Sequence, residues 1–288
     1  MKHHQSKLLY QVKDHAQSQK TFNIYWNHER TIAQTDVEHI ENMEDYYSSD
    51  YMSFHSKTLS LHNKLYGVIR QWMHHRKWKL ITSHFKKKNL KVLDFGAGGG
   101  YFADFLKKRV ETVDLIESNH RAVSQCLEKG HRVFKKLKEL PGNETYQVMT
   151  MWHVLEHLNN PKETIRRMKE YLEENGVLVI AVPNIQSFDA QKYKACWAAW
   201  DVPRHRWHFT PQGLIGLLKE AEFQILQKRT LFFDGFYISQ LSEKNKGSQF
   251  WFIKGLFWGA ASYVWGLMSG NYSTMVLVAR LHQRSPKE

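Results

Sequence analysis

Short apolar runs alternate with longer amphipathic segments over much of the chain. Apolar runs bounded by polar or glycine residues predict buried strands at 91–95, 113–117, 131–134, 146–152 and 177–182. The segments between and after them carry apolar residues three or four positions apart and predict helices at 101–109, 118–129, 160–174 and 210–221. Alternation of this kind is typical of right-handed βαβ units. We therefore expect an α/β fold with a doubly wound, mostly parallel sheet.

Two regions precede this alternating part. Residues 8–12 and 21–26 predict two short strands in a small N-terminal unit that extends to about residue 56. This unit either packs under the following domain or forms a lid over a ligand. Residues 57–90 predict a basic amphipathic helix, with Lys77 and other basic residues lying off an apolar stripe that contains Leu61, Leu65, Val68 or Ile69, and Trp72. The chain is thus divided into regions 1–56, 57–90 and 91–288.

An aromatic insert interrupts the C-terminal part. Residues 223–233 and 273–280 are further strand candidates, and an insert at about 234–272 separates them. Its segment 250–268 is rich in Trp and Phe, but Lys254 and several glycines make it a poor transmembrane span. In our first interpretation, this segment packs on the sheet or covers an apolar pocket. In the second, it makes peripheral contact with a membrane.

Composition adds a strong positive charge. The 288 residues include 41 Lys and Arg against 28 Asp and Glu, a formal net charge of +13. Such a surplus favours nucleic acid, anionic lipid or an acidic substrate, or it is only a solvated basic surface. The two cysteines, Cys126 and Cys196, cannot form a disulfide framework, and no apolar run follows the N-terminus. We expect a cytoplasmic protein, with peripheral attachment to the inner membrane as an option.

The turn after the first strand of the alternating part carries the clearest chemistry. Asp94 lies on that strand, and Gly96, Gly98 and Gly100 follow at every second position, where side chains would block the approach of a ligand. A helix then begins, with free N–H groups at its start. Glu117 ends the next strand, where an acid can accept hydrogen bonds from ribose hydroxyls. No Gly-x-x-x-x-Gly-Lys-Ser/Thr motif occurs, which argues against a P-loop NTPase.

With these residues the chain resembles the class I, Rossmann-like, S-adenosylmethionine-dependent methyltransferases. The resemblance covers about residues 91–223 and includes the runs 92–100, 152–161 and 176–184 together with Glu117. Within that class the Leu-Glu-His turn at 155–157 is most similar to bacterial small-molecule and quinone O-methyltransferases. The resemblance implies a seven-stranded sheet that ends in an antiparallel hairpin, formed here by 223–233 and 273–280.

The resemblance also implies the cofactor, S-adenosyl-L-methionine, and its contacts. The implied cofactor-binding residues are Asp94, Gly96, Ala97, Gly98, Glu117, Ser118, Trp152 and His153. Adenine contacts stay unassigned, because the acid that commonly follows the third strand is not evident here. Some relatives carry an N-terminal zinc ribbon, but the corresponding segment 25–30 has no cysteine. We therefore expect no metal and interpret the N-terminal unit as a degenerate, ribbon-like segment or a lid.

A hydroxyl acceptor benefits from a general base, most often histidine. The candidates are His153, His205 and His208, whereas His157 is expected to be structural. The alternative for each is a structural hydrogen bond.

The leading functional hypothesis is methylation of a small apolar or envelope-linked hydroxyl compound. An RNA methyltransferase is the second, because of the charge, although no Asn/Asp-Pro-Pro-Tyr/Phe motif follows the fourth strand. The third is a protein that binds S-adenosylmethionine at a membrane without transferring a methyl group. The oligomeric state stays open.

Overall fold

A seven-stranded sheet forms the centre of the computed structural model, which describes residues 7–47, 61–86 and 89–282, with only the backbone described for 61–66. The strand order is β10-β11-β8-β7-β4-β5-β6, and β10 and β11 form the antiparallel hairpin at one edge. This confirms the expected α/β fold and sheet. The strands are β4 (Lys91–Phe95), β5 (Thr112–Ile116), β6 (Arg132–Phe134), β7 (Tyr146–Trp152), β8 (Leu172–Pro183), β10 (Phe223–Arg229) and β11 (Thr274–Leu281).

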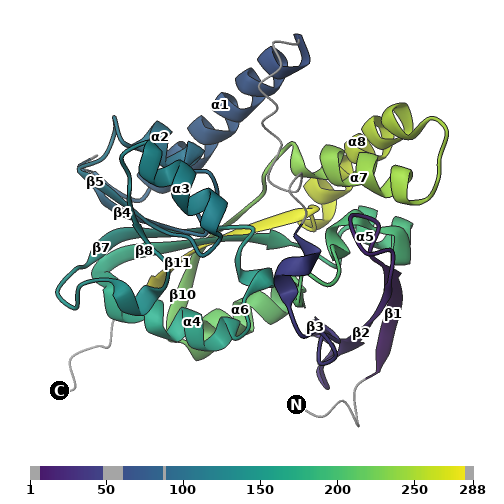
Figure 1. Cartoon of the computed structure of the whole chain (residues 1–288), viewed down its shortest axis with the longest axis horizontal. Coiled ribbons are helices and arrows are strands. Elements are labelled where there is room, and N and C mark those ends of the chain that lie inside the picture. Colours follow the sequence, from purple (N-terminus) through teal and green to yellow (C-terminus); the bar gives the residue numbers. More distant parts are fainter. Residues whose placement is uncertain (1–6, 48–60, 87–88, 283–288) are drawn as a thin grey trace.

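Helices cover both faces of this sheet (Figure 1). Adjacent strand residues point to opposite faces, so Val92 packs with Phe102 in one core layer and Leu93 packs with Ile165 in the other. The α-helices are α1 (Leu61–Thr82), α2 (Tyr101–Leu106), α3 (His120–Glu128), α4 (Pro161–Met168), α5 (Phe188–Tyr193), α6 (Pro211–Glu220), α7 (Asp234–Asn245) and α8 (Trp251–Ser269). Short 3₁₀ turns occupy Met43–Tyr46, Leu137–Glu139, Leu155–His157, Lys169–Tyr171, Lys194–Cys196 and Ala198–Trp200.

Two of the predicted boundaries are wrong. The helix predicted to reach residue 174 ends at Met168, and Leu172 already pairs with Tyr146 as the first residue of β8. The strand predicted to reach residue 233 ends at Arg229. Phe232 and Phe233 instead pack edge-on against Trp72 of α1, at ring separations of 6.1 and 5.2 Å. Tertiary packing overrides the local apolar pattern at both places.

Helix α1 departs from the predicted amphipathic pattern. Val68 and Trp72 of the proposed apolar stripe are exposed, and the side chains of Leu61 and Leu65 lie outside the described residues. Lys77, predicted to face solvent, is instead half-buried, with its Nζ atom 4.3 Å from the ring centre of Trp152. The prediction that the basic residues lie off the buried face is therefore wrong for Lys77.

The N-terminal unit forms a second, antiparallel sheet of order β1-β2-β3-β9. Its own strands are β1 (Leu8–Lys13), β2 (Thr21–Trp26) and β3 (Ile32–Thr35). The fourth, β9 (Trp207–Phe209), comes from the loop after β8, and Ala33 pairs with His208. Residues 48–56 of the proposed unit lie outside the described residues. Two segments far apart in the sequence thus share one small sheet beside the large one (Figure 1).

The aromatic insert forms the helical hairpin α7–α8 at one end of the molecule (Figure 1). Its two helices pack against each other, and α5 packs against both. In the described part of the chain, no helix combines the length and the apolar character that a membrane crossing requires.

Candidate active site

The glycine turn lies between β4 and α2, at the carboxyl end of the parallel strands. Gly96, Gly98 and Gly100 all have positive φ angles, of 73°, 54° and 73°, which favour glycine. A Cβ atom on Gly96 would lie 2.3 Å from Val154, whereas one on Gly98 would meet no atom within 4 Å. Gly96 therefore serves the packing of the turn, and Gly98 faces open space that a ligand can enter.

A buried acid stands directly before this turn. Asp94 is only 3% exposed and accepts a hydrogen bond of 2.6 Å from the hydroxyl of Thr150. Burial raises the pKa of Asp94 to about 6. The ammonium of Lys77 attracts this carboxylate electrostatically, and burial lowers the pKa of Lys77 to about 8. An acid and a base from distant parts of the chain thus interact electrostatically beside the glycine turn.

Glu117 follows β5 and is tied to backbone N–H groups. Its Oε2 atom accepts from Gly98 at 2.8 Å, and its Oε1 atom accepts from Ser118 at 2.8 Å and Asn119 at 2.9 Å. A carboxylate offers about four acceptor positions. Glu117 therefore fixes the glycine turn to the start of the next helix, while retaining limited capacity for a ligand hydroxyl.

His153 forms the centre of an ionic group at the end of β7. Its Nε2 atom lies 2.9 Å from Asp234 at the start of α7, and its Nδ1 atom lies 3.4 Å from the buried Glu156. Burial alone lowers the pKa of His153, but the two carboxylates outweigh it and raise that pKa to about 10. The residue also has a positive φ of 58°, an unfavourable conformation for a non-glycine residue. The two carboxylates thus favour the protonated form of His153 beside the glycine turn.

The other histidine candidates are engaged elsewhere. His205 Nδ1 lies 2.9 Å from the carbonyl oxygen of Ala199, and His208 Nε2 lies 2.8 Å from the hydroxyl of Thr35. Burial holds the pKa of His208 well below its usual value. The structure brings Asp94, the glycine turn, Glu117, Trp152 and His153 to one edge of the sheet, but it turns His208 toward the N-terminal sheet.

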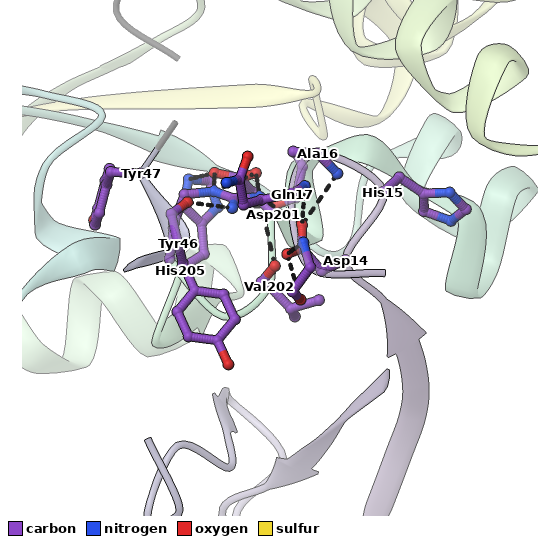
Figure 2. A network of polar contacts seen from close by, with 12 residues as sticks. Asp14, His15, Ala16, Gln17, Tyr46, Tyr47, Asp201, Val202 and His205 are labelled. Atoms are coloured by element: carbon purple, nitrogen blue, oxygen red, sulfur yellow. Dashed lines mark hydrogen bonds and ion pairs between the residues drawn. The ribbon is translucent and has the colours of Figure 1, made fainter. Parts of the chain in front are cut away.

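An ion-pair network joins the two sheets next to His205. The guanidinium of Arg204, itself buried, contacts Asp14 at 3.1 Å and Asp201 at 2.7 Å, and donates to the carbonyl of Tyr46 at 2.8 Å. Figure 2 shows Asp14, Asp201 and Tyr46 around this network, with His15 pointing away from it. The network fixes the loop that carries His205 and His208 to the N-terminal unit.

One group of described side chains could also ligate a cation. The ligand atoms of Glu156, His157 and His205 lie within 4.8 Å of one another. Neither carboxylate oxygen of Glu156 has a hydrogen-bond partner among the described residues. Burial and the neighbouring His205 lower the pKa of His157 to about 4. His157 also lies 3.0 Å from the carbonyl oxygen of Arg204, a contact that suits the structural role predicted for it.

Sequence reasoning missed two residues of this site. Asp234 begins the aromatic insert, and Lys77 lies on α1, far from every motif. A lone Asp before an aromatic helix carries no recognisable pattern. The signal for Lys77 was also absent, because a lysine in a basic amphipathic helix normally faces solvent.

Comparisons with known proteins identify the family of the chain. A protein family described as a methyltransferase domain matches residues 69–228. Among curated relatives, the ubiquinone biosynthesis O-methyltransferase of Rickettsia canadensis (strain McKiel) is 25% identical over 168 residues, covering 54% of this chain and 71% of the relative. The protein of the same name from Glaesserella parasuis serovar 5 (strain SH0165) is 30% identical over 107 residues, which are 33% of this chain and 45% of that protein.

Solved structures share the fold. The [4+2]-cyclase SpnF aligns with a TM-score of 0.50 and 17% identity over 73% of this chain and 81% of that chain. The mycolic acid cyclopropane synthase CmaA1, solved with SAH and CTAB, aligns with a TM-score of 0.50 and 12% identity over 72% of this chain and 83% of that chain. At these identities the likeness concerns the fold alone.

Proposed function

This chain belongs to the methyltransferase domain family, and from that premise we propose that it methylates a hydroxyl oxygen of a small apolar or envelope-linked compound. It is an S-adenosylmethionine-dependent methyltransferase with a Rossmann-like fold. The observation that carries the proposal is the Asp234–His153–Glu156 group at the edge of the glycine turn. The distant similarity to ubiquinone biosynthesis O-methyltransferases supports oxygen as the target and a lipid-like acceptor.

The residues present fit the cofactor. Gly98 leaves open space at the turn, and Asp94 supplies a buried carboxylate that suits the ammonium of a methionine moiety. We assign Gly96, Ala97 and Gly98 to the turn that holds this moiety, and Glu117 with Ser118 to the ribose end. Trp152 and His153 line the opening to the acceptor in this proposal. We add Lys77 to the cofactor-binding residues that the family resemblance implied. Its ammonium, which attracts Asp94 electrostatically, also suits the methionine carboxylate.

His153 and Asp234 act together in the proposed mechanism. Bound S-adenosylmethionine supplies an electrophilic methyl group. Transfer of that group to the acceptor oxygen would require loss of the hydroxyl proton, which the neutral ring of His153, oriented by Asp234, would accept. Because Asp234 and Glu156 raise the pKa of His153 to about 10, the neutral ring that accepts a proton becomes more populated as the pH rises toward that value. His205 and His208 stay predicted bases whose ring nitrogens have structural partners.

The N-terminal unit is proposed as a lid of residues 1–56 that borders the site, preceding the helical region 57–90 and the catalytic domain 91–288. Burial raises the pKa of Tyr47 to about 12, and the negative charges of Asp201 and Glu117 contribute to this rise. The hydroxyl of Tyr47 also lies 3.5 Å from His157 Nδ1.

Methyl transfer from labelled S-adenosylmethionine tests the acceptor class. The purified protein is incubated with separate lipid, small-molecule and RNA fractions of cells that lack the gene. We expect label in the apolar lipid fraction, and none with the His153→Asn variant. Label in RNA alone would overturn the proposed acceptor and support the alternative suggested by the net charge of +13. No label in any fraction, with cofactor bound, would instead support a protein that binds the cofactor without transfer.

A further inference from the structure

Helix α8 buries its smallest residues and exposes its largest. Gly255, Gly259, Ser262 and Gly266 form the buried stripe, at helical spacings of three and four. A Cβ atom on Gly255 would lie 2.4 Å from Gln240 Cα, and one on Gly259 would lie 2.6 Å from Phe236 Cα. The backbones of α7 and α8 are therefore in close contact, and of the aromatic residues of α8, Trp258 and Tyr263 also pack against neighbouring rings.

The opposite side of α8 forms a continuous apolar surface. We define the outer α8 surface by six side chains, of which Met268 is 79% exposed and Ile253 is 67% exposed: Ile253, Leu256, Phe257, Val264, Leu267 and Met268. Phe250, Trp251, Phe252 and Trp265 are also exposed on this helix and at its start. An exposed apolar patch of this extent is uncommon on a monomeric protein and marks an interaction surface.

The charge around this surface has one sign. From Lys244 to Lys287 the sequence contains no Asp or Glu. Lys246 lies exposed at the end of α7, Lys254 lies exposed in the first turn of α8, and the Nζ atom of Lys192 lies 3.3 Å from the ring centre of Trp258. At the other end, the Nζ atom of Lys228 would be 3.8 Å from a Cβ atom on Gly270. Positive charge therefore borders the apolar surface along its length.

We propose that the outer α8 surface lies in the interface of an anionic lipid bilayer, with α8 parallel to the membrane plane. Apolar and Trp side chains enter the headgroup region, and the bordering lysines attract anionic headgroups. A second copy of the chain is a poorer occupant, because a symmetric contact would bring lysines against lysines. The side chains point away from the fold, which disfavours the first interpretation of a roof over a pocket.

Docking of α8 would also orient the active site. Helix α7, in backbone contact with α8, begins at Asp234, which bonds His153. The site is thereby held next to the bilayer from which an apolar acceptor is drawn. This consequence rests on the proposed function, whereas membrane binding itself does not.

Vesicle flotation of the full chain tests the proposal, with phosphatidylglycerol vesicles compared with phosphatidylcholine vesicles. The test variant carries Ile253→Gln, Phe257→Gln and Leu267→Gln. The control carries Val68→Gln, Leu127→Gln and Leu8→Gln, three exposed apolar residues on other elements. We expect binding to phosphatidylglycerol that weakens as salt rises. The test variant should lose at least about 100-fold in affinity, since each of its three side chains contributes roughly 1 kcal/mol or more on burial.

Charge reversal gives a second measurement. Lys246→Glu with Lys254→Glu should weaken binding to phosphatidylglycerol by more than about tenfold, because each lysine near the surface contributes roughly 1 kcal/mol. Binding unchanged in both variants would overturn the proposal. So would a dimer in light scattering that the Gln variant converts to monomer. Cofactor affinity and methyl transfer to a soluble acceptor, measured on the same samples, report separately whether the proposed function holds.

Discussion

The Nε2 atom of His153 lies 2.9 Å from the Oδ2 atom of Asp234, although the two residues are 81 positions apart. The same carboxylate oxygen accepts a hydrogen bond of 2.7 Å from the hydroxyl of Thr274. The end of β7, the start of α7 and the start of β11 therefore meet at one atom. This contact joins the aromatic insert to the edge of the glycine turn.

Asp234→Asn should lower the pKa of His153 from about 10 toward the ordinary histidine value, because one of its two carboxylate partners loses its charge. We expect the limiting rate of methyl transfer at high pH, where the ring is neutral in both proteins, to fall by about 100-fold, a typical contribution of a positioned acid–base group. The pH at which activity rises should shift downward with the pKa. Titration of the His153 ring by NMR and a pH–rate profile measure both effects. Glu128→Gln, on the exposed end of α3, is the matched control; an unchanged profile in Asp234→Asn would remove the pair from the mechanism.

Gly98→Asp should reduce the affinity for S-adenosylmethionine by more than about 100-fold, because the new side chain occupies the open space at the turn. Gly96→Ala should act differently, since its Cβ atom would lie 2.3 Å from Val154. We expect it to destabilise the fold by about 2 kcal/mol through overpacking, with partial recovery when Val154→Ala is added. Isothermal titration and thermal unfolding separate the two effects. Full cofactor affinity in Gly98→Asp would contradict the site assignment.

Cofactor affinity should fall as the pH drops below about 6, the pKa to which burial raises Asp94. A bound ammonium group favours the ionised carboxylate, so binding below that pH requires Asp94 to release a proton. The affinity should change by up to about tenfold per pH unit there and level off above it. Asp94→Asn should bind weakly and without this dependence. An equal pH dependence in that variant would assign the effect to another group.

Lys77→Met should weaken cofactor binding by about tenfold while leaving the fold intact, because the methyl thioether can replace the buried part of the lysine stem. Lys79→Met, at an exposed position on the same helix, is the control. The comparison of dissociation constants at pH 7 measures the effect. Equal affinities in the two variants would show that the ammonium of Lys77 does not face the ligand.

Arg204→Met should destabilise the protein by about 3–5 kcal/mol, because it leaves the carboxylate of Asp14 buried without its cation. Burial alone raises the pKa of Asp14, but bonds from Ser18 and the charge of Arg204 hold it below the usual 3.8. The ionised native form is therefore favoured: this stabilisation is complete above pH 3.8 and is lost as the pH falls through the lower native pKa. Urea unfolding at pH 7 and pH 3 should show a smaller difference for the double variant Arg204→Met, Asp14→Asn than for the wild type.

Local pattern was sufficient for most of the large sheet. Val92 and Leu93 are both apolar and belong to a run bounded by glycines, which indicates a strand buried on both faces, and each of them packs into a different core layer. The helix at 160–174 was predicted too long, because apolar residues continue at helical spacing beyond its true end. From Leu172 onward these residues belong to β8 of the sheet. The strand to residue 233 was also too long, because Phe232 and Phe233 pack on α1.

The sequence by itself determined the strands and the glycine turn, because these depend on residues close together in the chain. Tertiary packing alone places Lys77 within electrostatic range of Asp94, Asp234 against His153, and β9 in the N-terminal sheet. The packing also determines that α8 turns its glycines inward and most of its large apolar side chains outward. These relationships depend on how distant segments pack. A periodic pattern of apolar residues distinguishes two faces of a helix, but it does not determine which of them is buried.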